Sequence, residues 1–209
     1  MGERPAVTIY DNKEHPMHFA KLAAAALVAA LSIAGPAKAA LLLNTGGSSA
    51  NTVTDYSTPG AVSFDLDLQN FNATTLRFEL QAEDLLGPLS LNALVRNLSG
   101  TALNQFHVDL SGISFLAAGS VTPTFGTLGS VSSGRDYASI RFASPEWAEF
   151  NFGNPLAVDG QADWILDTSG LAVGDTFAIS AEIPEPSTLA LLLPTLGLAG
   201  LISRRRRKN

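Results

Sequence analysis

The chain has 209 residues, with 13 Lys and Arg, 19 Asp and Glu, and a formal net charge of −6 at pH 7. This length allows one domain or two small ones, and the lack of cysteine excludes a disulfide framework, thiolate catalysis and Cys-ligated zinc. Between Ala40 and Ile183, four arginines and no lysine stand against fifteen Asp and Glu, a formal charge of −11. Because an acidic domain repels phosphate backbones, we expect no nucleic-acid partner.

The N-terminal part of the chain has the pattern of an export signal. A short basic region, Met17 to Lys21, precedes an Ala/Leu/Val-rich run from Leu22 to Ala34. This run is too short to span a bilayer, which favours a cleaved signal over an anchor. Ala37 and Ala39 fit the small-x-small pattern for cleavage, which makes Ala40 the first mature residue. We therefore predict a signal helix that is read by the export machinery and cut by signal peptidase.

These boundaries divide the chain into four parts. Residues 1–16 are polar and precede the signal, so we interpret them as an extension from an upstream start, with a genuine cytosolic extension as the alternative. Residues 17–39 form the signal peptide, 40–183 the exported domain and 184–209 a C-terminal tail.

Alternation of apolar and polar residues predicts that the exported domain consists of strands. In Val62–Leu68 the apolar side chains fall on one face, and Ser63, Asp65 and Asp67 fall on the other. Such alternation indicates half-buried strands of an antiparallel sheet. Further strands are predicted at Leu76–Gln81, Leu91–Arg96, Gln105–Leu110, Ile113–Leu116, Ser139–Phe142, Glu149–Phe152, Trp164–Leu166 and Thr176–Glu182. The stretch Leu41–Pro59 becomes rich in Gly, Ser, Thr and Asn, and is interpreted as a loop or an edge segment.

The spacing of these strands predicts the fold class. Turn signals separate them at intervals of about 8–15 residues, which is typical of an all-β, antiparallel β-sandwich of jelly-roll-like type. No stretch of the domain sustains the i, i+3, i+4, i+7 stripe of a helix. Helix is therefore expected only in the signal peptide and in the C-terminal tail.

Histidine and carboxylate residues are the candidates for catalysis in the exported domain. Its single histidine, His107, lies on the polar side of an alternating strand, so we interpret it as solvent-facing rather than as the base of a serine hydrolase. Glycoside hydrolysis needs two carboxyl groups roughly 5–10 Å apart. Glu146 with Glu149, or Asp65 with Asp67, would supply such a pair, but we interpret both pairs as solvated polar faces, because so acidic a domain contains such pairs by chance. We expect no enzymatic activity.

Metal and sugar binding are the remaining alternatives for the domain. Calcium needs only oxygen ligands, and Asp159, Asp163 and Asp167 form a carboxylate-rich stretch, although the EF-hand spacing is absent. We interpret these residues as ordinary loop acids and expect no cofactor, with structural calcium as the alternative. Three aromatic residues, Tyr137, Trp147 and Trp164, could form a carbohydrate-binding face, although aromatic residues of a sandwich more often lie in its core.

The C-terminal tail consists of three successive segments. Pro184-Glu185-Pro186-Ser187 comes first, and an apolar run from Leu189 to Ile202 follows, interrupted by Pro194, Thr195 and glycines. The last segment is the cationic block Arg204-Arg205-Arg206-Arg207-Lys208. An apolar run followed by cations predicts a short transmembrane helix whose basic end stays in the cytoplasm. The run covers only about 21 Å of a roughly 30 Å hydrocarbon core, which favours a temporary stop over a permanent span.

The order of these three segments at the end of the chain resembles the PEP-CTERM sorting signal of Gram-negative bacteria. The resemblance implies that exosortase cuts near Pro184, Glu185 and Pro186 and transfers the product to a lipid or a glycan. It also implies association with exopolysaccharide and biofilm. We therefore expect a non-enzymatic protein that is exported, held transiently in the inner membrane, and then placed at the cell surface or in the extracellular matrix. A carbohydrate-binding module is the alternative, and a glycoside hydrolase is a further one.

Overall fold

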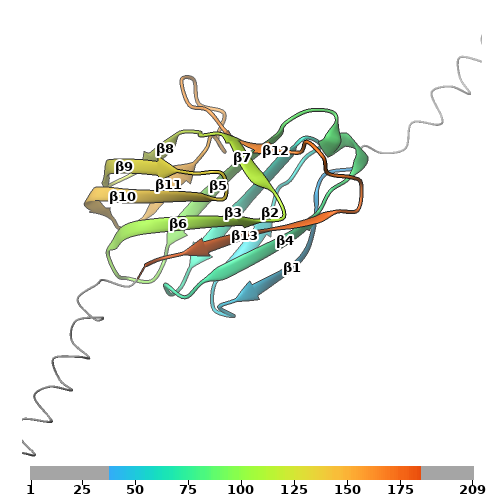
Figure 1. Cartoon of the computed structure of the whole chain (residues 1–209). Coiled ribbons are helices and arrows are strands. Elements are labelled where there is room, and N and C mark those ends of the chain that lie inside the picture. The colour runs from blue at the N-terminus through green and yellow to red at the C-terminus, as the bar shows by residue number, and fades with distance from the viewer. Residues whose placement is uncertain (1–37, 185–209) are drawn as a thin grey trace, which may run out of the picture. The chain divides into compact units, whose positions relative to one another are not determined.

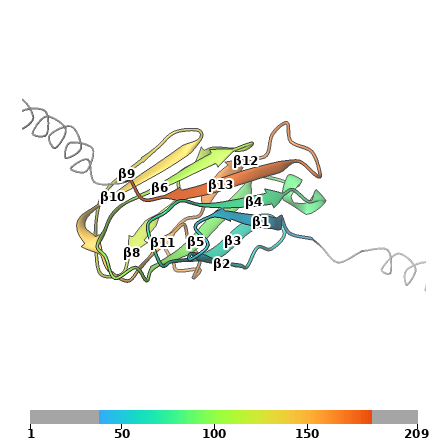
Figure 2. The same cartoon turned by 90° about the horizontal axis from the view of Figure 1, so that it is seen from below.

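A computed structural model describes residues 38–184, which form two β-sheets packed face to face (Figures 1 and 2). The predicted all-β sandwich is confirmed at this level. Residues 1–37 and 185–209 lie outside the described part, and with them most of the predicted signal helix and the whole predicted transmembrane segment.

Within residues 38–184, the first sheet has six antiparallel strands in the order β1-β4-β13-β6-β10-β9. These strands are β1 (Leu41–Gly47), β4 (Thr74–Glu79), β13 (Thr176–Glu182), β6 (Leu103–Ser111), β10 (Tyr137–Glu146) and β9 (Thr127–Ser133). The second sheet has the order β2-β3-β5-β11-β8, and β5 also pairs with β12, which in turn pairs with β7. Its strands are β2 (Thr52–Asp55), β3 (Ala61–Leu68), β5 (Leu89–Asn97), β11 (Glu149–Phe152), β8 (Val121–Pro123), β12 (Trp164–Asp167) and β7 (Ser114–Ala117).

One strand pair of the second sheet is parallel, contrary to the prediction of an antiparallel sandwich. β3 and β5 run in the same direction, from the pair Ala61 and Ser90 to the pair Leu68 and Asn97. The chain leaves β3 for β4 in the first sheet and then returns to the second sheet as β5. Because this excursion reverses the chain twice, β5 re-enters the second sheet parallel to β3.

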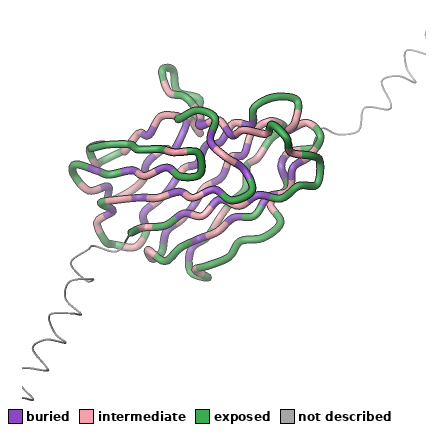
Figure 3. Tube along the Cα trace, viewed as in Figure 1, coloured by how far each residue is buried: buried purple, intermediate pink, exposed green. Residues whose placement is uncertain are grey.

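Alternating side chains fill the space between the sheets. Buried and partly exposed residues alternate along the whole of β3, as period-two geometry requires, and Figure 3 shows the same alternation in other strands. Phe150 packs against Phe106 and Phe142 with ring centroids 5.1 and 5.3 Å apart, in edge-on arrangements that aromatic pairs favour. The core therefore belongs to both sheets and makes residues 38–184 one folded unit.

The strands that the sequence pattern did not predict are all terminal strands in the order of their sheets. β1 and β9 bound the first sheet, and β2 and β8 bound the second. Every residue of β9 is exposed, so its sequence has no buried face and shows no alternation. β1 agrees with one of the two interpretations of its segment, an edge strand. Helix was expected only outside the domain, but a 3₁₀ turn, η1, forms at Ala82–Leu85.

The two ends of the described chain leave the sandwich at opposite ends (Figure 1). β1 begins with Leu41 opposite Glu79, and β13 also begins opposite Glu79, with Thr176. β13 then runs the length of the sheet and finishes beside His107. We call the end of the sandwich at which β13 finishes the tail end, and the other the distal end.

Candidate functional site

The sorting tail begins directly at the end of a central strand. β13 lies between β4 and β6, and its last residue, Glu182, pairs with His107 of β6. The next residue, Ile183, still packs against the core, and Pro184 is exposed. Proline has no N–H for a further ladder bond, so the strand cannot continue through it. The fold therefore places the start of the Pro-Glu-Pro segment at the surface, two residues beyond the sheet.

The remainder of the predicted sorting site falls outside the described residues. This applies to Glu185, Pro186 and Ser187, to the apolar run, and to the cationic block from Arg204 to Lys208. Over residues 38–184, no helix is long and apolar enough to cross a membrane.

The predicted signal-peptidase site lies where the folded domain begins. Ala37 is outside the described residues, Ala39 is half-buried, and Ala40 belongs to the buried core. A protease that binds an extended segment has no access to the Ala39–Ala40 bond in this arrangement. Cleavage at the predicted position therefore has to precede the docking of β1.

Glu146 is a fully buried carboxylate held by four backbone N–H groups. Oε2 accepts hydrogen bonds from the N–H groups of Phe125 and Gly126, at 2.9 and 2.8 Å. Oε1 accepts two more from Trp147 and Ala148, both at 2.9 Å. A Cβ on Gly126 would lie 2.9 Å from the carbonyl oxygen of Ser144, so this close approach requires glycine. The carboxylate thereby ties the β8–β9 loop to the β10–β11 turn.

These contacts keep Glu146 ionised. Burial is the largest single influence and raises the pKa, but the four backbone N–H groups together outweigh it and hold the pKa of Glu146 below its ordinary value of 4.5. Because the folded-state pKa is lowered, the carboxylate stabilises the fold fully above about pH 4.5, and this contribution is lost as the pH falls through the folded-state pKa. A general acid needs the opposite shift, toward a raised pKa.

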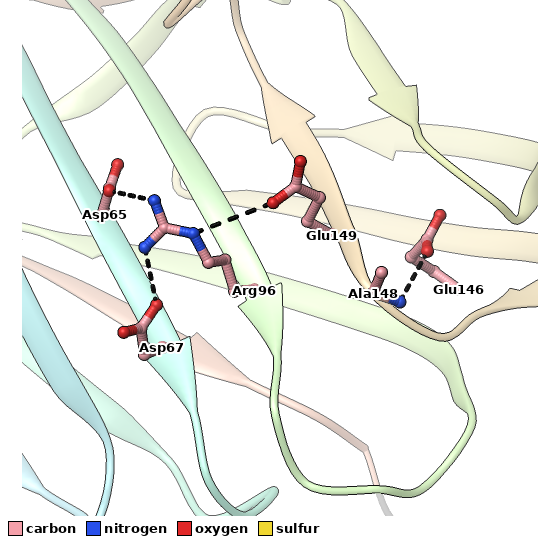
Figure 4. A network of polar contacts seen from close by, with 6 residues as sticks. All are labelled: Asp65, Asp67, Arg96, Glu146, Ala148 and Glu149. Carbon is pink, nitrogen blue, oxygen red and sulfur yellow. Dashed lines mark hydrogen bonds and ion pairs between the residues drawn. The ribbon is translucent and has the colours of Figure 1, made fainter.

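A second group of carboxylates surrounds Arg96 on the outer face of the second sheet (Figure 4). One guanidinium nitrogen of Arg96 donates to Asp65 at 2.5 Å and another donates to Asp67 at 2.9 Å. The Nε atom lies 3.8 Å from Glu149 Oε2. The hydrogen bonds to Asp65 and then to Asp67 raise the pKa of Arg96. The parallel pairing of β3 and β5 creates this arrangement, because it sets Asp67 opposite Arg96.

The two carboxylate pairs expected from the sequence are therefore rearranged. Asp65 and Asp67 do share a face, but Arg96 lies between them. Glu149 joins that cluster, whereas the Glu146 side chain points to the neighbouring turn (Figure 4). With Glu146 buried and fully bonded, the structure does not bring Glu146 and Glu149 together as an acid and a nucleophile around a substrate.

His107 lies on the outer face of the first sheet, as the alternation predicted. Its Nε2 atom is 3.2 Å from Asp109 Oδ1. Its ring stacks on Tyr137 with centroids 5.9 Å apart and an interplanar angle of 19°. Across the strand pair, His107 is opposite Ser139 of β10. Among the hydrogen bonds of the described residues none joins this histidine to a serine hydroxyl, so the observed partners are those of a surface side chain.

The carbohydrate face proposed from Tyr137, Trp147 and Trp164 is wrong. Trp164 is fully buried and stacks on Phe152, with ring centroids 4.6 Å apart and planes 3° from parallel. Tyr137 and Trp147 are exposed, but Tyr137 opens β10 whereas Trp147 follows its last residue. The length of this strand thus separates the two exposed rings, and the third lies inside the core.

The carboxylates considered for calcium are not gathered into a site. Asp163 Oδ1 accepts a hydrogen bond from the N–H of Asn154 at 2.8 Å, which closes the loop before β12. Asp167 ends β12 and accepts from the N–H of Ser169 at 3.0 Å. Within the described range 38–184, no three His, Cys, Asp or Glu side chains are grouped so that they could hold a metal ion.

Comparison with known proteins places the tail in a defined class. Residues 182–208 match the model of the PEP-CTERM protein-sorting motif, which begins at the last residue of β13. No curated protein and no solved structure matches the chain. The chain therefore carries a PEP-CTERM sorting motif, which indicates an exported protein that is sorted by exosortase to the cell envelope or surface.

Proposed function

We propose that the protein is a non-enzymatic component of the cell surface or extracellular matrix that exosortase releases from a temporary membrane anchor. The signal peptide over 17–39 directs export, and signal peptidase exposes Ala40. The apolar run from Leu189 to Ile202 then holds the chain in the inner membrane, with the cations of the block 204–208 in the cytoplasm. Exosortase cuts near Pro184–Pro186, and the domain joins the exopolysaccharide matrix.

One observation carries this proposal: the sorting motif follows the central strand β13 without an intervening linker. Because Ile183 belongs to the domain and Pro184 is already exposed, cleavage at the Pro-Glu-Pro segment leaves every strand of the sandwich intact. The carboxylates that suggested hydrolysis have structural partners instead, which supports a role without catalysis.

Mass spectrometry of the mature C-terminus tests the proposal. We expect the product isolated from the cell surface to end near Pro184–Pro186 and to lack the block 204–208. A chain in which Pro184 and Pro186 are both replaced by alanine should accumulate uncut in the membrane. A surface product that retains Arg204 to Asn209 would instead identify the tail as a plain anchor.

A carbohydrate-binding module is the second candidate, and a groove on the outer face of the second sheet favours it. The groove has a volume of about 520 Å³ and is lined by Tyr56, Ser63, Asp65, Asn92, Arg96 and Leu156, among others. Tyr56 is exposed, and an exposed ring beside hydrogen-bonding groups suits a sugar. Asn92 is only 7% exposed and accepts a hydrogen bond from Ser63 at 2.6 Å through its carbonyl oxygen, so it belongs to the floor of the groove.

Titration of the domain with the polysaccharide of its own host tests this second candidate. We expect binding to weaken at least about tenfold in Tyr56→Ala, the size of effect that loss of one stacking contact gives. Tyr137→Ala, which removes an exposed ring outside the groove, is the matched control. Absence of binding by the unaltered domain, or equal loss in both variants, would rule out the groove as a sugar site.

A further inference from the structure

The tail end of the sandwich differs from the rest of the domain in its charge. Five loops meet there, namely residues 48–51, 69–73, 98–102, 124–126 and 147–148, and none of them contains a charged residue. The loops of the distal end include residues 80–88, 134–136 and 168–175, which carry Glu83, Asp84, Arg135, Asp136 and Asp175. In a domain with a formal charge of −11, the loops of the tail end are thus uncharged, and the exposed Glu182 at the end of β13 is the charged residue beside them.

Three large apolar side chains project from these uncharged loops. Leu98 is 49% exposed, Phe125 73% and Trp147 58%. We call these three residues the apolar rim. Isolated exposed apolar residues are common and need no explanation, but these three come from three neighbouring loops at one end of the fold.

The apolar rim is held in place by the buried polar residues beneath it. Glu146 binds the N–H groups of both Phe125 and Trp147, so its carboxylate joins two of the three rim loops. Asn97 connects the third rim loop, which begins at Leu98, to the other two. Its backbone N–H donates to the carbonyl oxygen of Ala148 at 2.6 Å, and its side-chain amide donates to the carbonyl oxygen of Glu146 at 3.2 Å. The rim is therefore a fixed feature of the sandwich and not a set of independent loops.

The covalent chain brings this end of the sandwich close to the membrane. Pro184 leaves from the tail end, and only five residues later, at Leu189, the apolar run begins. Five residues span at most about 18 Å even when fully extended. If the apolar run occupies the bilayer, the tail end has to face the lipid surface, and the charged loops of the distal end face away from it.

From these observations we propose that the apolar rim rests on the lipid interface while the tail is in the membrane. Aromatic residues are enriched at the membrane–water boundary, and apolar side chains bury about 5–10 Å deep there. Because the surrounding loops carry no charge, contact of the rim residues with lipid desolvates no ion of these loops. This contact would fix the orientation in which Pro184 is presented at the membrane surface, so the inference rests on the proposed anchoring of the tail.

The two tryptophans of the chain make the contact measurable. The full-length protein is reconstituted in phosphatidylcholine vesicles whose acyl chains carry bromine, which quenches tryptophan emission on contact. Trp164 is enclosed between the sheets and serves as the internal reference, whereas Trp147 reports the rim. We expect bromine to quench the protein, and the quenching to be lost in Trp147→Phe and strongly reduced in the double variant Leu98→Ser, Phe125→Ser. Leu86→Ser is the matched control, because Leu86 is 86% exposed but lies at the distal end, and it should leave the quenching unchanged.

Protection of the cationic block 204–208 from added trypsin gives an independent reading of whether the tail crosses the membrane. A protected tail without quenching of Trp147 would overturn the rim contact and leave the anchoring intact. An unprotected tail would remove the proposed anchor and the rim contact with it. If the rim variants slow cleavage in exosortase-containing membranes but Trp147 is not quenched in pure lipid, the rim is a protein-binding surface, and the lipid contact is wrong.

Discussion

Glu146→Ala is expected to lower the free energy of unfolding of the domain by on the order of 3–5 kcal/mol. The substitution removes one acceptor group from four backbone N–H groups at once, and all four donate to a side chain that is fully buried. An unpaired buried donor costs roughly 1–3 kcal/mol. The loss also disconnects the loop at Phe125 and Gly126 from the turn at Trp147, so the local structure opens at the tail end. Urea unfolding of residues 40–183 measures the effect.

Two further variants separate this effect from a general loss of charge. Glu149→Ala removes a nearby carboxylate that is partly exposed and 3.8 Å from Arg96, so we expect a change within about 1 kcal/mol. Glu146→Gln keeps the volume and one carbonyl acceptor but loses the charge, and should fall between the other two. Equal stability of Glu146→Ala and Glu149→Ala would show that the four hydrogen bonds do not stabilise the domain.

The pH dependence of the same comparison follows from the lowered pKa of Glu146. Above about pH 4.5, the stability difference between the unaltered domain and Glu146→Gln should be constant. At lower pH the difference should shrink, because protonation removes the acceptor charge that the N–H groups bind. The other carboxylates titrate in both proteins and cancel in the difference. A difference that grows on acidification would mean that the folded-state pKa is raised.

The interior strands were predictable from the sequence because one face of each is buried. β11 and β13 have the predicted limits, and the limits of β3 differ from the prediction by one residue. Alternation records burial on one face only, and it disappears where a strand has no consistently buried face. β9, with all its residues exposed, carries Ser, Thr and Gly that are equally typical of loops. The sequence pattern therefore identifies the middle strands of each sheet and misses most of the edge strands; β7, which pairs only with β12, is the edge strand that it did predict.

The roles of the acidic residues depend on pairing that no local pattern contains. Asp67 and Arg96 are 29 positions apart and meet because β3 and β5 are parallel. The sequence presents Glu146 as half of a carboxylate pair, but its partners in the structure are backbone N–H groups, which leave no signal in the sequence. The one residue type that relates to these hydrogen bonds is Gly126, because its lack of a side chain lets the β8–β9 loop approach Glu146. The tail, in contrast, was identifiable because its function resides in contiguous segments of sequence.

Deletion of Arg204 to Lys208 is expected to reduce correctly processed surface protein by at least tenfold. Each cation near an anionic cytoplasmic surface contributes about 1 kcal/mol, so the block retains the tail by roughly 5 kcal/mol. The apolar run itself is short, about 21 Å against a roughly 30 Å core, and Pro194 interrupts its backbone hydrogen bonds. Without the cations, only this short and interrupted run opposes passage of the tail through the membrane. The chain should then appear outside the inner membrane with its C-terminus uncut, as seen by fractionation followed by mass spectrometry.

Replacement of the four arginines by lysine is the matched control for this deletion. It keeps five positive charges but removes the guanidinium groups, so normal processing is expected if charge alone holds the tail. Loss of processing in this variant as well would assign the arginines a specific contact with the sorting machinery. Normal processing of the deletion variant would show that the apolar run holds the chain without its cations, which would contradict the role of the cations as the membrane stop. Only one residue, Ile183, separates Pro184 from β13. Exosortase therefore has to come close to the sandwich in order to cut near Pro184. Deleting the cations therefore tests the membrane stop on which both the proposed function and the rim contact depend.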